Sequence, residues 1–408
     1  MSYQGDNLMS VKRTNRSAAL RILHEQGSMS RKRLAENMHL TPAAITKIVG
    51  EMIGEGLLSE GEMISCGNAG RREVLIDINN EYACGLGVLI LLGSATLSAV
   101  WLDGSVIFSE TVDLPEHVPA EETVRALSAR LMELVRENGV SRERISGLGI
   151  AVRGITSEDG RTVRNSFGAL AETDYPLCEA FEAETGIRTT MENNVRSLLA
   201  AQMFLAKDGT SSGAQFFVRC DTGIGAALSI DGEIWHGVTA QCAEIGHIPV
   251  VRRGGKPCHC GKSGCLETIA SPGAILEDAR GILSPDETPL LWRRFGGDSG
   301  KMTVHDVFQA ASNGDSGASV IVDRAVKTLG MGIKTVIYLV DPGKIVFYGD
   351  MFEDPYYLSL LNSELQEGVD TRHSTVFERS RYNKILDERA ACLLAVEEFM
   401  DRGGILPL

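Results

Sequence analysis

Residues 244–267 read EIGHIPVVRRGGKPCHCGKSGCLE, and this segment carries the strongest chemical signal in the chain. Three cysteines lie within eight residues, two glycines let the loop between them turn, and a histidine precedes the first cysteine by eleven positions. Three thiolates and one imidazole form the closed tetrahedral ligand set of structural zinc sites. We therefore predict that Zn²⁺ is bound by four residues, which are His247, Cys258, Cys260 and Cys265.

Two alternatives to this ligand set remain open. Cys258 and Cys260 are one residue apart, which is tighter than the knuckle of a zinc finger, so His259 is a possible ligand in place of His247. The three cysteines could also be incidental buried thiols. The first thirteen residues, MSYQGDNLMSVKR, lack the apolar core of a signal peptide, and no apolar run is long enough to span a membrane. We expect a cytoplasmic protein without membrane insertion, in which cysteines serve as thiols or metal ligands rather than disulfides.

The sequence around the cysteine segment has a repeated α/β pattern. Glycine-bearing apolar strands are expected at 85–88 and 97–102, followed by a helix over 121–138 and a strand over 147–152. A second set begins near Gln215 and includes the glycine turn DTGIG at 221–225. Such a turn can hold phosphate with its backbone amides, although many hairpins carry glycine for conformational reasons alone. The two sets predict the two lobes of an actin-like ATPase or sugar-kinase fold. We place lobe 1 at 81–192, with a C-terminal helix at 386–400 packing back on it, and lobe 2, with the zinc motif, at 193–385.

The first 80 residues predict a winged helix-turn-helix, the DNA-binding module of many regulators. A helix is expected over Asn15–Gln26, Ser30 caps a second helix, and Thr41 followed by Pro42 starts a third that runs to about Glu55. Two strands then flank the turn GNAGRR at 67–72, which would be the tip of the wing. A helical protein-interaction module is the alternative interpretation of the helices.

The charge distribution supports DNA binding by this module. Residues 11–50 hold eight basic and two acidic residues, a net charge of +6, whereas the whole chain carries −14, so the rest carries −20. This asymmetry is typical of a protein in which one module meets phosphate, although solvated basic helix faces would give the same charge count. The residues expected to contact operator DNA are Arg31, Thr41, Ala43, Ala44, Thr46, Lys47, Arg71 and Arg72.

Together these motifs resemble the ROK family, named for repressor, open reading frame and kinase, from about Asn15 to Phe399. The resemblance rests on EIGH at 244–247, on CxCGxxGCxE at 258–267, on DTGIGAA at 221–227 and on LVDPxxIV at 339–346. The winged helix marks the repressor branch, which includes xylose-, N-acetylglucosamine- and glucose-responsive regulators. The resemblance implies that a sugar or sugar-phosphate effector is bound by Asn193, Asn194, Glu244, His247 and Glu267. His247 would bind zinc through one ring nitrogen and sugar through the other.

Three departures from the family kinases predict a sensor without enzyme activity. Asn194 replaces the aspartate that serves as base, and an amide cannot accept the proton of a sugar hydroxyl. The stretch 87–94 lacks the aspartate of the first phosphate loop. Tyr348 stands where the kinases carry glycine beside adenosine, and its side chain is expected to crowd a nucleotide there. We therefore expect a repressor that forms a homodimer or homotetramer. The alternatives are an active ROK sugar kinase with an accessory DNA-binding domain, and a repressor controlled by a protein effector.

Overall fold

The structure is a computed structural model that describes residues 8–65, 72–115, 118–207, 213–367, 374–382 and 384–406. Its contacts divide the chain into two compact units, Met1–Thr210 with Ile385–Leu408, and Ser211–Lys384. We expected the second lobe to begin at residue 193, which would place the helix α6 (Asn194–Ala206) in that lobe. Instead α6 belongs to the first unit, because it packs against the C-terminal helix α13 (Ile385–Asp401).

The first unit begins with the predicted winged helix-turn-helix. Its elements are α1 (Leu8–Gln26), β1 (Met29–Ser30), α2 (Arg31–Asn37), α3 (Pro42–Gly54), β2 (Leu58–Ser65) and β3 (Arg72–Ile78). The strands pair in the order β1-β3-β2, and the β2–β3 hairpin is the wing. The hydroxyl oxygens of Ser30 and Thr41 cap α2 and α3 by accepting from backbone amides at 3.3 Å, and Pro42 occupies the first turn of α3, as predicted.

Helix α1 begins at Leu8, seven residues earlier than predicted. Its first two turns have no apolar stripe facing a partner, since Met9 is 82% and Val11 is 45% exposed. Hydrophobic periodicity detects a helix through its buried face, so it misses turns that project into solvent.

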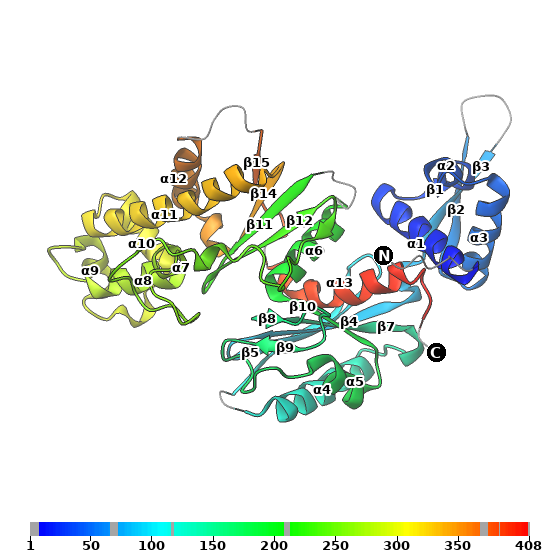
Figure 1. Ribbon diagram of the computed structural model, residues 1–408, viewed down its shortest axis with the longest axis horizontal. Helices are drawn as coiled ribbons and strands as arrows, with labels where there is room; N and C mark the ends of the chain where they lie inside the picture. The colour runs from blue at the N-terminus through cyan, green and yellow to red at the C-terminus, as the bar shows by residue number, and fades with distance from the viewer. Residues whose placement is uncertain are drawn as a thin grey trace. The chain divides into compact units, whose positions relative to one another are not determined.

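Lobe 1 of the same unit is built on a five-stranded sheet in the order β10-β7-β4-β5-β6 (Figure 1). The strands are β4 (Cys84–Leu91), β5 (Ser94–Trp101), β6 (Val106–Asp113), β7 (Ile145–Val152) and β10 (Thr189–Asn193), and β8 (Ile155–Thr156) pairs with β9 (Val163–Asn165) in a small separate sheet. Helices α4 (Ala120–Glu137) and α5 (Leu177–Thr185) pack against each other and share one apolar core with the sheet. Helix α13, red in Figure 1, lies on β4 and β7 and also contacts α6.

The glycines that interrupt the lobe 1 strands allow α13 to lie directly on the sheet. A Cβ atom on Gly87 would lie 2.5 Å from the Cys392 sulfur, and one on Gly149 would lie 1.8 Å from the Ala391 carbonyl oxygen. Both distances are far below van der Waals contact, so these strand positions accept only glycine unless the helix moves.

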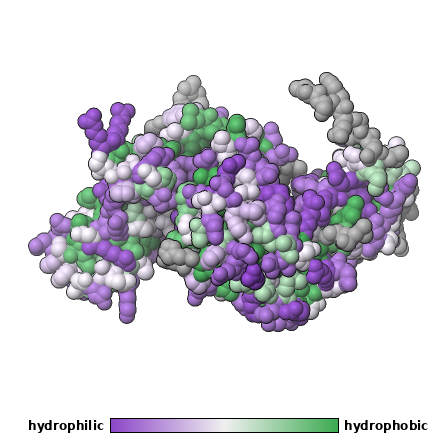
Figure 2. Space-filling model, turned by 60° about the horizontal axis from the view of Figure 1, so that its bottom comes forward, coloured by the Kyte–Doolittle hydropathy of each residue, from purple (hydrophilic) through white to green (hydrophobic). Residues whose placement is uncertain are grey.

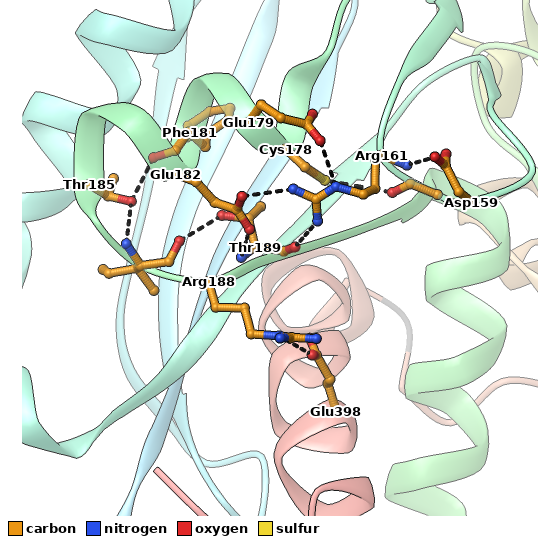
Figure 3. Close-up of polar contacts among 12 residues, drawn as sticks. Asp159, Arg161, Cys178, Glu179, Phe181, Glu182, Thr185, Arg188, Thr189 and Glu398 are labelled. Carbon is orange, nitrogen blue, oxygen red and sulfur yellow. Dashed lines mark hydrogen bonds and ion pairs between the residues drawn. The ribbon is translucent and has the colours of Figure 1, made fainter. Parts of the chain in front are cut away.

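A polar network fixes the start of β10, the strand that leads to Asn193 (Figure 3). The Arg161 guanidinium donates to Glu182 at 2.7 Å, and the other Glu182 oxygen accepts from the first backbone amide of β10 at 2.9 Å. Arg188 donates to Glu398 of α13 at 2.6 Å. Strand β10 is thus held by α5 on one side and by α13 on the other.

The second unit repeats the topology of lobe 1. Its sheet has the order β13-β12-β11-β14-β15, from β11 (Ala214–Cys220), β12 (Ile224–Ile230), β13 (Glu233–Ile234), β14 (Lys344–Tyr348) and β15 (Val376–Arg379). Three antiparallel strands are followed by two parallel ones in both sheets. Its helices are α7 (Glu267–Ala270), α8 (Pro272–Gly281), α9 (Pro289–Phe295), α10 (Val304–Ser312), α11 (Ser316–Val340) and α12 (Pro355–Gln366). The duplication confirms the predicted actin-like, sugar-kinase architecture.

The face of the molecule shown in Figure 2 carries mainly hydrophilic side chains. On the face shown in Figure 2, hydrophobic residues occur in small groups among them. Within the described ranges, no helix combines the length and apolar character that crossing a bilayer requires.

Candidate functional site

The cysteine segment of the second unit forms a compact cluster of potential metal ligands. One donor atom from each of His247, Cys258, Cys260 and Cys265 lies within 4.8 Å of the other three. The sulfur atoms of Cys260 and Cys265 are 3.6 Å apart, and the Cys258 sulfur lies 3.5 Å from His247 Nδ1. This cluster could hold a metal ion. His259 belongs instead to a second possible set with His247 and Glu267, in which its Nδ1 lies 2.9 Å from the Glu267 carboxylate.

The loop that carries the cysteines depends on close backbone packing. Isolated β-bridges join Pro249 to Cys265 and Pro257 to Ser263, so the loop folds back on the segment that follows His247. Gly264 has φ +75°, and a Cβ there would lie 2.3 Å from the Val251 carbonyl oxygen. Only glycine combines this conformation with this approach, which is why the cysteines can converge.

The thiols differ in how readily they ionise. Burial raises the pKa of Cys258 and of Cys265. Burial opposes ionisation of Cys260 as well, but the Lys262 amide and hydrogen bonds from the other two thiols outweigh it and lower the Cys260 pKa. Cys260 is therefore the ligand best prepared as a thiolate before a metal arrives.

His247 and Glu267, both predicted to contact sugar, lie in or beside the cysteine cluster. His247 Nδ1 lies on the side of Cys258, whereas Nε2 lies 4.0 Å from a carboxylate oxygen of Glu244. Glu267 Oε1 accepts from the Cys258 thiol at 2.9 Å, and Oε2 lies beside Gly223 in the turn between β11 and β12. The cysteine cluster thus contacts both residues.

The other two predicted sugar contacts, Asn193 and Asn194, belong to the first unit. The Asn193 side-chain oxygen caps α6 by accepting from Val195 N at 2.8 Å, and its Nδ2 donates to the Gly154 carbonyl at 2.7 Å. Asn194 is the first residue of α6 and is buried, yet its amide makes no hydrogen bond with any residue that the structure describes. By capping α6, Asn193 therefore positions Asn194, whose side-chain amide is available to bind a ligand.

Comparison with protein families gives two matches, one for the lobes and one for the helix-turn-helix. Residues 93–392 match the ROK family, and residues 15–59 match the MarR family. The chain belongs to the ROK family. The ROK match covers most of the chain, and the MarR match covers most of the helix-turn-helix.

Two curated regulators match the chain over more than four fifths of their own length. The chain is 29% identical to the DNA-binding transcriptional dual regulator NagC of Escherichia coli K12, over 85% of this chain and 83% of that protein. It is 30% identical to the DNA-binding transcriptional repressor Mlc of the same strain, over 84% and 82%. A crystal structure of a ROK family transcriptional regulator, described as a homologue of the E. coli Mlc protein, superposes with a TM-score of 0.81 over 97% of this chain and 98% of that one, at 23% identity. The match to this crystal structure supports the fold described above.

The structure corrects one of the three departures from the ROK kinases. Tyr348 was expected to crowd a nucleotide, but its side chain is buried, and its ring centroid lies 5.6 Å from that of Phe217 in the same sheet. Tyr348 therefore contributes to packing and does not obstruct open space. The other two departures stay predictions. In the structure, β4 and β5 are joined by the tight turn Leu92–Gly93, without an aspartate, and Asn194 is the first residue of α6.

The DNA-facing module of this ROK protein has fewer free cations than its charge count suggested. Four basic side chains form internal ion pairs, which are Lys12–Glu51, Arg16–Glu55, Arg21–Asp401 and Arg31–Glu60. Arg31, predicted to contact DNA, is held at 2.7 Å from Glu60 of the wing. Long-range partners of this kind leave no local pattern in the sequence.

The exposed surface of the helix-turn-helix retains four free cations, which are Arg13, Lys32, Arg33 and Lys47. Each is exposed, and none forms an ion pair with a residue in the described parts of the chain. Lys32 and Arg33, both in the first turn of α2, are exposed cations that were not among the predicted DNA contacts. Among the other predicted contacts, Thr41 and Ala43 are exposed, Ala44 is half-buried, and the Thr46 hydroxyl is exposed and donates to the Pro42 carbonyl of its own helix. Arg71 lies outside the described residues, and of Arg72 only the backbone is described, in β3.

Proposed function

We propose that this protein is a sugar-responsive transcriptional repressor of the bacterial cytoplasm, which binds operator DNA through its winged helix. The observation that carries the proposal is the similarity to NagC and Mlc over more than four fifths of each chain, together with the MarR-family match of the helix-turn-helix at residues 15–59. A homodimer or homotetramer is expected, because a single winged helix makes few contacts and a symmetric pair binds two half-sites.

The cysteine cluster is proposed to hold a structural Zn²⁺. Two thiolates at about 2.3 Å from a tetrahedral zinc are about 3.8 Å apart, and a thiolate and an imidazole nitrogen are about 3.6 Å apart. The corresponding distances are 3.6 Å between Cys260 and Cys265 and 3.5 Å between Cys258 and His247. The ligand set therefore matches zinc in chemistry and in size. His259, paired with Glu267, is left as a neighbour of the site.

We propose that the sugar is held by Asn194, Glu244, His247 and Glu267. Carboxylates accept from sugar hydroxyls, and an imidazole or an amide both donates and accepts, so the set can recognise a polyol. Asn193 supports the site by capping α6. In this arrangement Asn194 can bind a hydroxyl but cannot remove its proton, so binding occurs without phosphoryl transfer.

DNA contacts are proposed for Lys32 and Arg33 to the phosphate backbone, and for Thr41, Ala43 and Lys47 on the N-terminal half of α3 to the bases. The first helix of a helix-turn-helix crosses the backbone and the second enters the major groove. The exposed cations on α2 and α3 fit these two roles.

A thermal-shift screen tests the effector assignment. Glucose, xylose and N-acetylglucosamine, each free and as its phosphate ester, are added to the full chain, and every compound that raises the melting temperature is tested for release of a DNA duplex selected by the protein from a random pool. We expect at least one compound to stabilise the protein and to change its DNA affinity. Absence of selected DNA would refute the repressor assignment, and absence of any stabilising sugar would refute the sugar assignment in favour of a protein effector.

An active sugar kinase is the second candidate, and the burial of Tyr348 keeps it in consideration. A coupled assay for ATP consumption with the same compounds separates the two functions. We expect no turnover from the wild type or from Asn194→Asp, since the β4–β5 turn also lacks the phosphate-binding aspartate. Turnover by the wild type would make the protein a kinase, and turnover by Asn194→Asp alone would show that the nucleotide site is intact.

A further inference from the structure

Helix α6 connects the proposed sugar contact with the DNA-binding module. It begins at Asn194, and every residue from Asn194 to Phe204 is buried. A helix enclosed on all sides cannot bend locally without disturbing its packing, so a displacement at its first turn is carried to its last turn. Figure 1 shows α6 beside α13, on which it packs.

The last turn of α6 meets the winged helix at His24 of α1. His24 Nε2 lies 2.9 Å from the Phe204 carbonyl oxygen, and the centroids of the His24 and Phe204 rings are 3.9 Å apart. The carbonyl can only accept, so His24 is the donor. The same carbonyl, in the last turn of α6, also accepts from the Lys207 backbone amide at 3.2 Å, so the His24 ring supplies its second hydrogen bond. Burial lowers the pKa of His24, and the nearby cations Lys207 and Arg21 act in the same direction, so the ring is neutral at neutral pH.

A second contact continues from lobe 1 to the recognition helix. Arg16 of α1 is almost fully buried, and its Nε donates to the carbonyl of Gly403, just after α13, at 2.7 Å. Its two terminal nitrogens donate to the carboxylate of Glu55 at 2.8 and 2.5 Å. Glu55 is the C-terminal cap of α3, the helix that presents Lys47. One guanidinium therefore joins lobe 1 directly to the end of the recognition helix.

We propose that α6 and α1 form the route by which sugar occupancy alters DNA binding, with His24 receiving the movement of α6 and Arg16 passing it to α3. This inference rests on the proposed function, because it takes Asn194 as a sugar contact. A sugar that pulls on Asn194 moves α6 along its axis and with it the Phe204 carbonyl. Since His24 and Arg16 lie two turns apart on α1, a tilt of α1 moves Glu55 and so reorients α3.

The first experiment needs neither sugar nor DNA. Hydrogen–deuterium exchange is measured on the full chain after Asn193→Ala, which removes the cap of α6, with Asn193→Asp as a control that keeps an acceptor. We expect exchange of the amides at 20–26 in α1 to rise up to about five-fold in Asn193→Ala, the usual effect of losing an N-cap, and to stay unchanged in Asn193→Asp. In a His24→Leu background the response should disappear. If Asn193→Ala does not fold, Asn193→Gly, which also removes the side-chain acceptor but destabilises the helix less, takes its place, with a smaller rise expected.

An unchanged α1 in Asn193→Ala, or an equal rise with and without His24, would overturn the route. Either result would show that α6 and α1 are not mechanically connected through this contact.

The second experiment measures coupling. The affinity for the selected DNA duplex is determined with and without the sugar found in the screen, and allosteric ligands typically change such an affinity about 5- to 150-fold. His24→Leu should reduce this sugar-induced change in DNA affinity to below about two-fold. The DNA affinity without sugar and the sugar affinity without DNA should stay as in the wild type. His24→Gln restores a donor and should recover part of the sugar-induced change, and Thr14→Ala, an exposed position on the same helix, should keep all of it.

Coupling that persists in His24→Leu would overturn the inference while leaving the proposed function intact. A wild type that binds no sugar or no DNA would refute the proposed function, and the exchange experiment would still decide whether the two helices are connected.

Discussion

The close packing of α13 on the lobe 1 sheet allows a prediction of stability whose magnitude follows from one distance. In Gly149→Ala the new methyl group would lie 1.8 Å from the Ala391 carbonyl oxygen, whereas ordinary contact begins at 3.4 Å. The helix backbone would have to move by about 1.6 Å, the difference between these values. Overpacking a core typically costs about 1–3 kcal/mol even where side chains can rotate away. Because the obstacle here is backbone, we expect a cost of about 3 kcal/mol or more.

This cost can be measured by thermal unfolding of the full chain, followed by circular dichroism or calorimetry. For a unit of this size about 1 kcal/mol corresponds to about 2–4 °C, so the midpoint should fall by about 6–12 °C. Gly54→Ala is the matched control, because a Cβ at this helical position meets nothing within 4 Å. Alanine is favoured over glycine in helices by about 1 kcal/mol, so the control should melt at or above the wild type. A Gly149→Ala midpoint within about 2 °C of the wild type would refute the packing described for α13.

Three further predictions concern the DNA surface, the metal cluster and the contact between α6 and α1. Lys32→Ala with Arg33→Ala should weaken binding to all duplexes in a fluorescence anisotropy titration and lower the salt slope by about 1.8 for each subunit bound to DNA. Arg31→Ala should leave the slope unchanged, and equal slopes in all three proteins would contradict the phosphate assignment. Cys265→Ser should lose the zinc that elemental analysis is expected to find at about one ion per chain, and a wild type purified without zinc would contradict the metal assignment. Because the pKa of His24 is lowered in the folded state, protons bind the unfolded chain more readily below about pH 6.5. The wild type should therefore lose stability relative to His24→Leu as pH falls from 7.5 to 5.5, and parallel melting profiles would show that His24 is not buried as a neutral ring.

The sequence alone was sufficient to predict features that depend on residues close together in the chain. The caps at Ser30 and Thr41 act within three residues of themselves, so their positions could be predicted. The cysteine cluster could likewise be predicted, because its four residues lie within nineteen positions and their chemistry is specific.

Features that depend on distant partners were not predictable in the same way. Arg16 was one of eight basic residues in the charge count, and only the fold shows that its guanidinium joins Gly403 to Glu55. The strand glycines were interpreted through turns and phosphate loops, whereas Gly149 owes its place to a helix about 240 residues later in the chain. Asn193 was expected to contact sugar, and its use as a cap became visible once β10 and α6 were seen to meet at that residue.

The position of α13 in the chain also bears on synthesis. The sheet of lobe 1 is complete at Asn193, but the helix that covers β4 and β7 begins at Ile385, about 190 residues later. At about 5–20 residues per second, a ribosome needs about 10 to 40 seconds to make the intervening segment. During that interval the second unit, which is contiguous in sequence, has all of its residues available, while the nascent first lobe exposes the bare glycine face of its sheet. The partners of Arg16 and Arg21 at Gly403 and Asp401 emerge later still, so a nascent winged helix is not yet attached to its sensor.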